Sequence, residues 1–234
     1  MAIYRNELLA GLPAHDREAV GPHLRPVDLA LNQVLHEAGV PIDQVYFVEN
    51  GLVSLTANTG DNGLVEVGMT GRDGMVGTPV LLNPQALAVH RTVVQIPGNG
   101  WSMRSATLRD LAGRMPDLRD RCLRSLHFAM IQVSQSAACN ARHELPERLA
   151  RWLLMARDQV DSDDVPMTQE FLSFMLGVRR AGVSAVTNTL QDQGLIRQAR
   201  GHLILLDRAG LEAEACSCYG LIEAARKQVM QDGK

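Results

Sequence analysis

Lysine is nearly absent from this chain of 234 residues. It occurs only at positions 227 and 234, so arginine supplies 21 of the 23 basic residues. An arginine side chain offers planar, bidentate hydrogen bonding that a lysine side chain cannot. The formal net charge is only −3, which by itself favours no partner of opposite charge.

Long hydrophobic runs are also missing. No run approaches the roughly 18 apolar residues that a membrane span needs, and residues 1–10 carry charge in an amphipathic pattern without a signal-peptide core. We therefore expect a cytoplasmic protein with no membrane segment. Hydrophobic residues make up 46% of the chain and charged residues 21%, which is typical of a globular protein of one or two domains.

Cysteine is scarce and confined to the second half of the chain. The four cysteines are Cys122, Cys139, Cys216 and Cys218, a density that does not fit a secreted disulfide framework. Cys216 and Cys218 have the wrong spacing for a zinc knuckle, and no second cysteine pair accompanies them. We expect thiols in or near a helix and no metal site, with a metal role for this pair as the minor alternative.

The first 100 residues combine two short helical patterns with many short β-type runs. Residues 45–48 are β-branched and aromatic, residues 49–51 predict a turn, and residues 59–63 predict a hairpin turn. Many short strands separated by glycine turns indicate a sandwich, roll or barrel. Further breaks are expected at residues 71–74, at Gly77 and at residues 97–100.

A long helix is predicted from Pro116 to about Asn140. One stripe repeats with heptad spacing from position 122, and a parallel stripe holds positions 123, 130 and 137. Two adjoining stripes favour a helix that packs on two partners, one of them a second copy of the chain. The alternative is a core helix within a single chain. The predicted dimer contacts are Cys122, Leu126, Ala129 and Val133.

The C-terminal part alternates helices with a hairpin. Thr168 is a predicted N-cap, Gly177 ends that helix, and a second helix follows with Val183, Val186 and Leu190 facing inward. This order is the plan of a winged helix-turn-helix; the alternative is any small helical domain with a hairpin. Around it we expect a helix at residues 147–159, an acidic loop at 161–166, a two-stranded wing around residues 196–206 and a last helix at 208–231.

Three ordered stretches together resemble the Crp/Fnr family of bacterial transcription regulators: residues 29–82, 147–154 and 167–206. The resemblance covers the chain essentially end to end. It implies an α+β protein with a cyclic-nucleotide-binding-like β-roll (a jelly roll), a dimerisation helix and a winged helix-turn-helix domain. The implied domain boundaries are 1–115, 116–141 and 142–234.

The resemblance also implies a sensor pocket, but here the pocket is altered. Family members that bind cyclic AMP hold its phosphate at a short helix beginning Gly-Glu-Leu, with an Arg-Ser/Thr pair downstream. The matching residues are Gly77, Thr78 and Pro79, so the carboxylate that holds the ribose is lost and one backbone donor is removed. Arg91 and Thr92 remain as the Arg-Ser/Thr pair, so half of an anion site is kept. We expect no response to cyclic AMP, and an effector that the sequence leaves unidentified.

Other cofactors are not expected. The iron–sulfur members of the family carry an N-terminal cysteine cluster, which this chain lacks. Haem would need a ligand arrangement that His15, His23, His36 and His90 do not form. Asn140, placed where some members contact a nucleobase, is more simply a polar residue that sets helix register.

The recognition helix implied by the resemblance departs from that of the best-known members. Arg180 is kept, whereas Ala181 and Ala185 replace a Glu and a second Arg, so a different half-site is expected. Arg180 is the best match for a bidentate contact to guanine. The full predicted DNA-binding set is Thr168, Gln169, Arg179, Arg180, Ser184, Thr187, Asn188, Arg197 and Arg200.

The predicted function is therefore a dimeric, sequence-specific DNA-binding regulator whose partners are operator DNA, a second copy and RNA polymerase. The alternative is a small-ligand or cyclic-nucleotide-binding module that acts through protein contacts. An enzyme is not expected, since the sequence has no nucleophile elbow, P-loop, metal pair or dinucleotide fingerprint.

Overall fold

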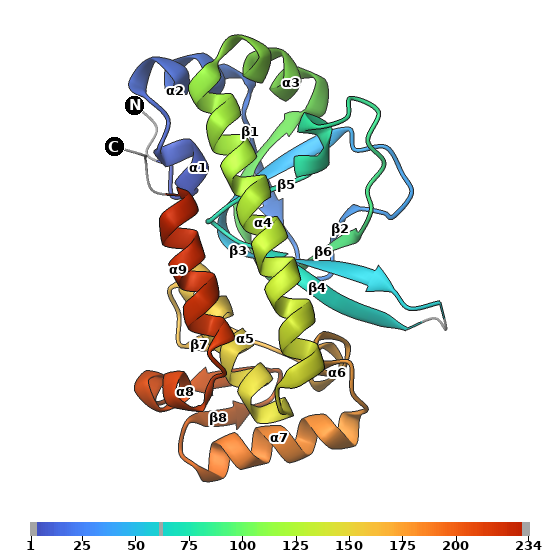
Figure 1. The fold of residues 1–234 in the computed structure, drawn as a ribbon, viewed down its shortest axis with the longest axis vertical. Helices are drawn as coiled ribbons and strands as arrows, with labels where there is room; N and C mark the ends of the chain where they lie inside the picture. Colours follow the sequence, from blue (N-terminus) through green and yellow to red (C-terminus); the bar gives the residue numbers. More distant parts are fainter. Residues whose placement is uncertain (1–3, 61–62, 231–234) are drawn as a thin grey trace. The chain divides into compact units, whose positions relative to one another are not determined.

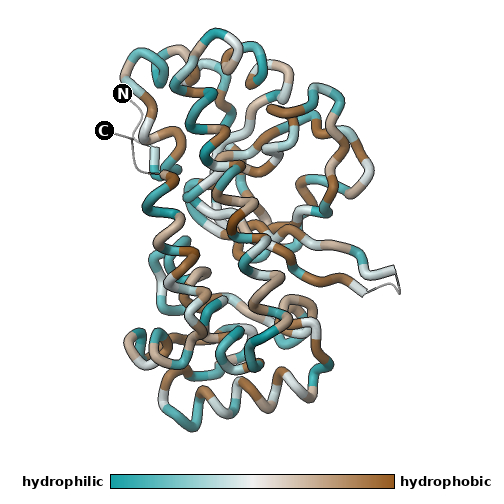
Figure 2. The backbone as a smooth tube through the Cα atoms, in the orientation of Figure 1, coloured by the Kyte–Doolittle hydropathy of each residue, from teal (hydrophilic) through white to brown (hydrophobic). Residues whose placement is uncertain are grey.

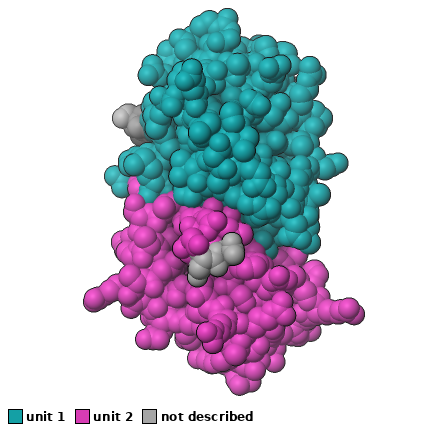
Figure 3. Space-filling view, turned by 90° about the vertical axis from the view of Figure 1, so that its right-hand side faces the viewer, with its two compact units in different colours: residues 1–55, 69–130, 226–234 teal, residues 56–68, 131–225 magenta. Residues whose placement is uncertain are grey.

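The computed structural model describes residues 4–60 and 63–230 (Figure 1). The chain forms two compact units: residues 1–55, 69–130 and 226–234 in the first, and residues 56–68 and 131–225 in the second (Figure 3). The long helix α4 (Pro116–Arg142) contributes to both. Within the described residues, no helix is both long and apolar enough to cross a membrane.

An antiparallel sheet of six strands forms the centre of the N-terminal part, in the order β1-β6-β3-β4, with β2 paired to β6 and β5 to β3. Its strands are β1 (Arg25–Leu29), β2 (Val34–His36), β3 (Gln44–Asn58), β4 (Leu64–Thr70), β5 (Met75–Val76) and β6 (Arg91–Arg104). The helices here are α1 (Glu7–Ala10), α2 (Ala14–Val20), η1 (Gly21–His23), η2 (Thr78–Leu81) and α3 (Ser105–Arg114). The predicted hairpin at residues 59–63 joins β3 and β4; residues 61–62 lie outside the described residues.

Two predicted breaks are wrong. Residues 49–51 lie inside β3 and residues 97–100 lie inside β6, so each run is one long strand instead of two short ones. Gly51 has a φ of 102°, and a Cβ there would come within 2.7 Å of the Ile96 carbonyl oxygen. Glycine at this position lets strands β3 and β6 approach each other closely. This role of glycine differs from its role in a turn, where it reverses the chain.

The hydrophobic core of the first unit joins its helices to its sheet. Leu8 of α1, Phe47 of β3 and Leu108 of α3 are fully buried together with Leu118 and Cys122 of α4. Along the helices, hydrophobic and hydrophilic residues alternate (Figure 2), as expected where one face packs on a core. The first half of α4 is therefore bound into the first unit by its own apolar face.

The second unit contains the predicted helix-turn-helix and wing. Its remaining elements are α5 (Leu145–Val160), β7 (Asp164–Pro166), α6 (Gln169–Leu176), α7 (Arg180–Asp192), β8 (Ile196–Ala199), β9 (His202–Leu205), α8 (Arg208–Glu214) and α9 (Cys218–Met230). Buried Trp152 of α5 stacks near Phe171 of α6 and donates its indole N–H to Oε1 of Glu66 at 2.6 Å. The fold class predicted from the sequence, α+β with a β-sheet domain, a long helix and a winged helix-turn-helix, is confirmed.

Two local predictions in this unit are wrong. The acidic loop ends in strand β7, which pairs with β9 to make a three-stranded sheet in the order β7-β9-β8. The last helix is two helices, because residues 215–217 are not helical. Cys216 and Cys218 are both buried, and residues two apart on a helix do not share a face. An irregular link is what allows both thiols to turn toward the same place.

Candidate nucleic-acid interface

The turn between α6 and α7 is fixed by caps at both ends of α6. Oγ1 of Thr168 accepts a hydrogen bond from the backbone N–H of Phe171 at 3.2 Å. At the other end Gly177 adopts a φ of 66°, the left-handed conformation that ends a helix with little strain in glycine. Both predicted boundaries of this helix are therefore confirmed.

Helix α7 presents arginines at its N-terminus. Val183, Val186 and Leu190 are buried, as predicted, and Arg179 and Arg180 are exposed. The Arg180 side chain is 72% exposed, and its Nη2 lies 3.8 Å from Oε2 of Glu170, itself 64% exposed. A pair this long and this exposed contributes little and is screened by salt, so the guanidinium remains available to another anion.

The expectation that Thr187 faces outward is wrong. Its side chain is fully buried, and its Oγ1 donates to the carbonyl oxygens of Val183 and Ser184 at 3.0 and 3.2 Å. Thr187 stands four residues after Val183 and therefore shares its inward face. A back-bonded threonine on the core side of a helix cannot reach a base edge without turning the helix.

The other polar residues of the predicted set connect α7 to its neighbours. Ser184 donates to Oε1 of Gln169 at 3.4 Å, and Asn188 accepts from Nε2 of Gln198 on the wing at 3.0 Å. These bonds join the start of α6, the outer face of α7 and strand β8. The predicted contacts Gln169, Ser184 and Asn188 are thus brought together with Arg180 at one exposed edge of the domain.

Two wing arginines complete this surface. Arg197 on β8 and Arg200 in the β8–β9 turn are exposed, and Gly201 has the positive φ of 77° that the tight turn requires. Across the residues that the structure describes, Arg179, Arg197 and Arg200 form no side-chain hydrogen bond or ion pair. Unpaired guanidinium groups suit phosphate oxygens, which they can bind in a bidentate manner.

The remnant of the anion site lies in the first unit. Gly77, the N-cap residue before η2, has a φ of 99°. Thr78 is buried, and Pro79 follows within the first turn. Arg91 forms an ion pair with Glu37 through its Nε at 3.3 Å. The basic group that was predicted to hold a phosphate is thus already paired with a carboxylate.

Thr92 and His36 face each other on the paired strands β6 and β2. Thr92 is buried, and its Oγ1 has no hydrogen-bond partner among the described residues. Nε2 of His36 lies 2.8 Å from the Gln44 carbonyl oxygen. Burial lowers the pKa of His36, and the hydrogen bond to Gln44 acts in the opposite direction.

The predicted dimer stripe on α4 needs correction at its first position. Cys122 is fully buried in the core of the first unit, so it cannot contact a second copy; burial raises the pKa of its thiol to about 12. Leu126, Ala129 and Val133 are half-buried within the single chain.

The exposed row of α4 instead follows the second stripe. It begins at Leu123, which is half-buried, and continues with the exposed residues His127, Met130, Ser134, Ala137 and Ala141. Periodicity located both stripes but could not say which one the chain's own core covers.

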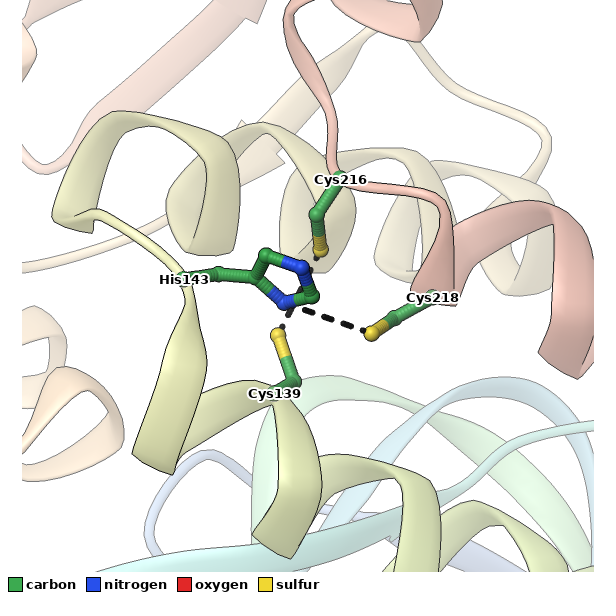
Figure 4. A group of neighbouring side chains, drawn as sticks. All are labelled: Cys139, His143, Cys216 and Cys218. Atoms are coloured by element: carbon green, nitrogen blue, oxygen red, sulfur yellow. Dashed lines mark hydrogen bonds between the residues drawn. The ribbon is translucent and has the colours of Figure 1, made fainter.

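The structure also brings together four side chains that no sequence pattern groups. Cys139 and His143 lie one turn apart at the end of α4, and Cys216 and Cys218 lie in the link before α9 and at its first residue (Figure 4). The two sulfurs of Cys139 and Cys216 are 3.4 Å apart, and Sγ of Cys218 is 3.5 Å from Nδ1 of His143. The expectation that the Cys216–Cys218 pair stands alone is wrong. Cys139 contacts Cys216 across 77 residues of sequence, and His143 contacts Cys218 across 75.

Burial and the nearby Arg151 guanidinium both affect the pKa values of thiols in this group. Burial, followed by the hydrogen bond with Cys139, raises the pKa of Cys216 to about 12. Burial also raises the pKa of Cys139, and the nearby Arg151 guanidinium acts in the opposite direction. The thiol of Cys218 accepts a hydrogen bond from Nε2 of Gln135 at 3.1 Å.

Comparison with known proteins identifies the C-terminal domain. The profile of the Crp-like helix-turn-helix domain matches residues 147–214, which contain α5 through α8. These residues are a Crp-like helix-turn-helix domain. This match agrees with the helix-turn-helix domain that the sequence resemblance implied for this part of the chain.

Solved structures show a similar fold over most of the chain. FixK2 from Bradyrhizobium japonicum is similar with a TM-score of 0.70 and 15% identity over 82% of this chain and 98% of that chain. The CRP-family regulator TTHB099 from Thermus thermophilus has a TM-score of 0.66 and 24% identity over 81% and 96%. The c-di-GMP-responsive regulator CLP from Xanthomonas campestris has a TM-score of 0.68 and 17% identity over 83% and 100%. A search of curated proteins gave no match.

Proposed function

We propose that this protein is a transcription regulator that binds a specific operator as a homodimer in the cytoplasm, and that cyclic AMP does not control it. The observation that carries sequence-specific binding is the pair of exposed arginines at the start of α7, beside Gln169 and Ser184. A helix N-terminus that enters the major groove can place an arginine fork on O6 and N7 of guanine. Arg180 is proposed to read this base, Arg179 and the polar neighbours to assist, and the wing arginines Arg197 and Arg200 to bind phosphates.

Domain roles follow the division expected from the sequence. Residues 1–115 are proposed to be the sensor, residues 116–141 the dimerisation helix and residues 142–234 the DNA-binding domain, with RNA polymerase as a further partner. In the dimer, the exposed row of α4 that includes Met130 and Ala137 is proposed to contact its copy. Met130 is 61% exposed, and large exposed apolar side chains on a long helix favour a helix–helix contact.

Insensitivity to cyclic AMP rests on three features of the remnant anion site. Thr78 is in the place of the carboxylate that would hold the ribose, Pro79 lacks a backbone donor, and Arg91 is paired with Glu37. The effector, if it is not cyclic AMP, is of another chemical class. Since one structural neighbour is described as c-di-GMP-responsive, c-di-GMP is a reasonable second probe beside cyclic AMP.

The test is selection of genomic DNA fragments by the purified full-length protein, with and without cell extract, followed by a salt series on the recovered operator. Specific binding predicts an enriched motif with two-fold symmetry and a steep fall in affinity with salt. Binding of cyclic AMP or c-di-GMP by calorimetry, without any enriched DNA motif, would favour the alternative of a ligand-binding module that acts through protein contacts.

A further inference from the structure

We propose that Cys139, His143, Cys216 and Cys218 bind a single zinc ion that joins the end of α4 to the start of α9. In Figure 4 the four side chains point toward one another from two separate segments of the second unit. Their ligand atoms, three sulfurs and one ring nitrogen, all lie within 4.8 Å of one another. Three cysteines and one histidine are an established ligand set for structural zinc.

The distances fit one ion. With zinc–sulfur bonds of about 2.3 Å and tetrahedral geometry, ligand atoms lie about 3.8 Å apart. The separations of 3.4 Å between the Cys139 and Cys216 sulfurs and 3.5 Å between the Cys218 sulfur and the His143 nitrogen are within a few tenths of an ångström of that value. An iron–sulfur cluster would need some of its ligands farther apart, because its four ligands are divided over two or four irons.

A second, independent observation points to negative charge at this place. Arg151 is buried, with only 5% of its surface exposed, and its Nε has no hydrogen-bond partner among the described residues. Its remaining hydrogen bonds go to the hydroxyl of Ser136 and the thioether of Met155, neither of which carries charge. A buried guanidinium without an anion is costly.

Zinc binding supplies that missing anion. The three thiols release their protons to solvent and the imidazole binds in its neutral form, so one Zn²⁺ and three thiolates leave the site with a net charge of −1. Arg151 lies close enough to Cys139 to interact with its charge. Arg151 has no anionic partner while the thiols are neutral. Its positive charge is therefore compensated when the metal is bound.

Gln135 acts on the site through Cys218. Its Nε2 donates to the Cys218 sulfur at 3.1 Å, as groups around metal sites commonly do to orient a ligand. Gln135 is thus a positioning residue, and its loss is expected to weaken metal binding by about 10- to 100-fold without abolishing it.

The site explains the irregular link at residues 215–217. Cys216 and Cys218 are separated by one residue and both point into the cluster, an arrangement that a continuous helix does not permit. The proposal concerns metal binding alone and does not depend on DNA binding, so it can fail or succeed independently of the function proposed above.

The experiment uses the full-length protein purified under reducing conditions. Elemental analysis is expected to find about one zinc per chain. After removal of the metal with a chelator, titration with Co²⁺ is expected to give the visible absorption bands of tetrahedral thiolate-bound cobalt at one equivalent, and added Zn²⁺ should bleach them. Uptake of one Zn²⁺ should release about three protons, measured with a pH indicator.

Matched variants distinguish the loss of a cluster side chain from the loss of another thiol or histidine. Cys218→Ser and His143→Ala should each weaken binding by more than the roughly 100-fold upper bound for outer groups, and Gln135→Ala should fall between them and the wild type. Cys122→Ala, which removes a buried thiol outside the cluster, and His127→Ala, which removes an exposed histidine from the same helix, should bind normally.

The proposal is overturned if the folded, reduced wild-type protein neither retains zinc nor develops cobalt bands. It is also overturned if the ligand variants bind as tightly as the two controls. If a reduced chain binds no metal but readily forms a disulfide between Cys139 and Cys216, the cluster is a thiol pair with a redox role, and zinc is excluded.

Discussion

Two regions of the molecule contain arginines that could bind a phosphate, and they differ in whether those arginines are already paired. In the first unit Arg91 is paired with Glu37, beside a loop in which threonine and proline occupy the ligand-holding positions. In the second unit Arg179 and Arg200 are exposed without a partner among the described residues, and Arg180 has only a long, solvent-exposed contact with Glu170. The same type of side chain is paired in the first unit and available in the second.

An arginine in the sequence therefore does not by itself identify an anion-binding site. A guanidinium that is already paired with a carboxylate gains less from binding a phosphate than an unpaired one does. An unpaired guanidinium gives up only its hydration. The comparison predicts large effects of substitutions in the second unit and on the dimer contact, and small effects in the sensor remnant.

The largest effect is expected from breaking the dimer. Met130→Glu combined with Ala137→Glu places like charges across the proposed helix–helix contact. Light scattering should then show a monomer, and operator affinity should fall by about 100- to 10,000-fold because the two half-sites are no longer bound together. Leu82→Glu, which changes a residue 68% exposed in the first unit, serves as the control and should leave the dimer intact. A variant that stays dimeric would show that another surface holds the two copies.

Arg180→Ala is expected to cost about 1–3 kcal/mol on the operator, with relaxed preference at one base pair per half-site. Titrations of the operator and of a scrambled duplex measure both changes. Arg25→Ala, at an exposed arginine on β1, should alter neither. Equal loss on both duplexes would mean that Arg180 only positions the protein and that Arg179, Ser184 or Asn188 reads the base.

Arg200→Ala on the wing should weaken binding to all sequences about equally. If Arg200 contacts a phosphate, the slope of log affinity against log salt should decrease by about one per protomer, since one fewer counterion is released. A salt series on the operator and on the scrambled duplex gives this slope. A loss confined to the operator would instead assign Arg200 to base reading.

The smallest effect is expected from cyclic AMP, which should change operator affinity less than about twofold because the ribose contact is lost. Glu37→Gln, which removes the partner of Arg91, should leave this unchanged, since releasing the arginine does not restore a carboxylate at Thr78. Calorimetry and mobility shifts with the nucleotide test both statements. Low-micromolar binding with matching tightening on DNA would contradict the prediction.

Local sequence signals predict much of the fold. The cap at Thr168, the glycine at position 177 and the inward spacing of Val183, Val186 and Leu190 all depend on residues within a few positions of one another, and the structure confirms them. The long helix, predicted from Pro116 to about Asn140, extends from Pro116 to Arg142. Heptad spacing cannot tell which of two stripes faces the core, which is why the prediction for Cys122 is wrong.

Strand length is less predictable, for a physical reason. Glycine permits both a reversal of the chain and the close approach of two strands, and the sequence looks the same in each case. At Gly51 the neighbouring β6 backbone decides between them. The third strand of the wing sheet, β7, likewise exists only because β9 pairs with it.

Local sequence specified the periodicity of the helices, the caps of the helix-turn-helix and the order Gly77-Thr78-Pro79, because all of these are properties of neighbouring residues. Tertiary packing sets which arginines are unpaired, which face of α4 is exposed, and the meeting of Cys139 and His143 with Cys216 and Cys218. The contact between Cys139 and Cys216, for example, joins residues 77 positions apart. Contacts at that separation are set by the packing of whole elements and leave no pattern in the local sequence.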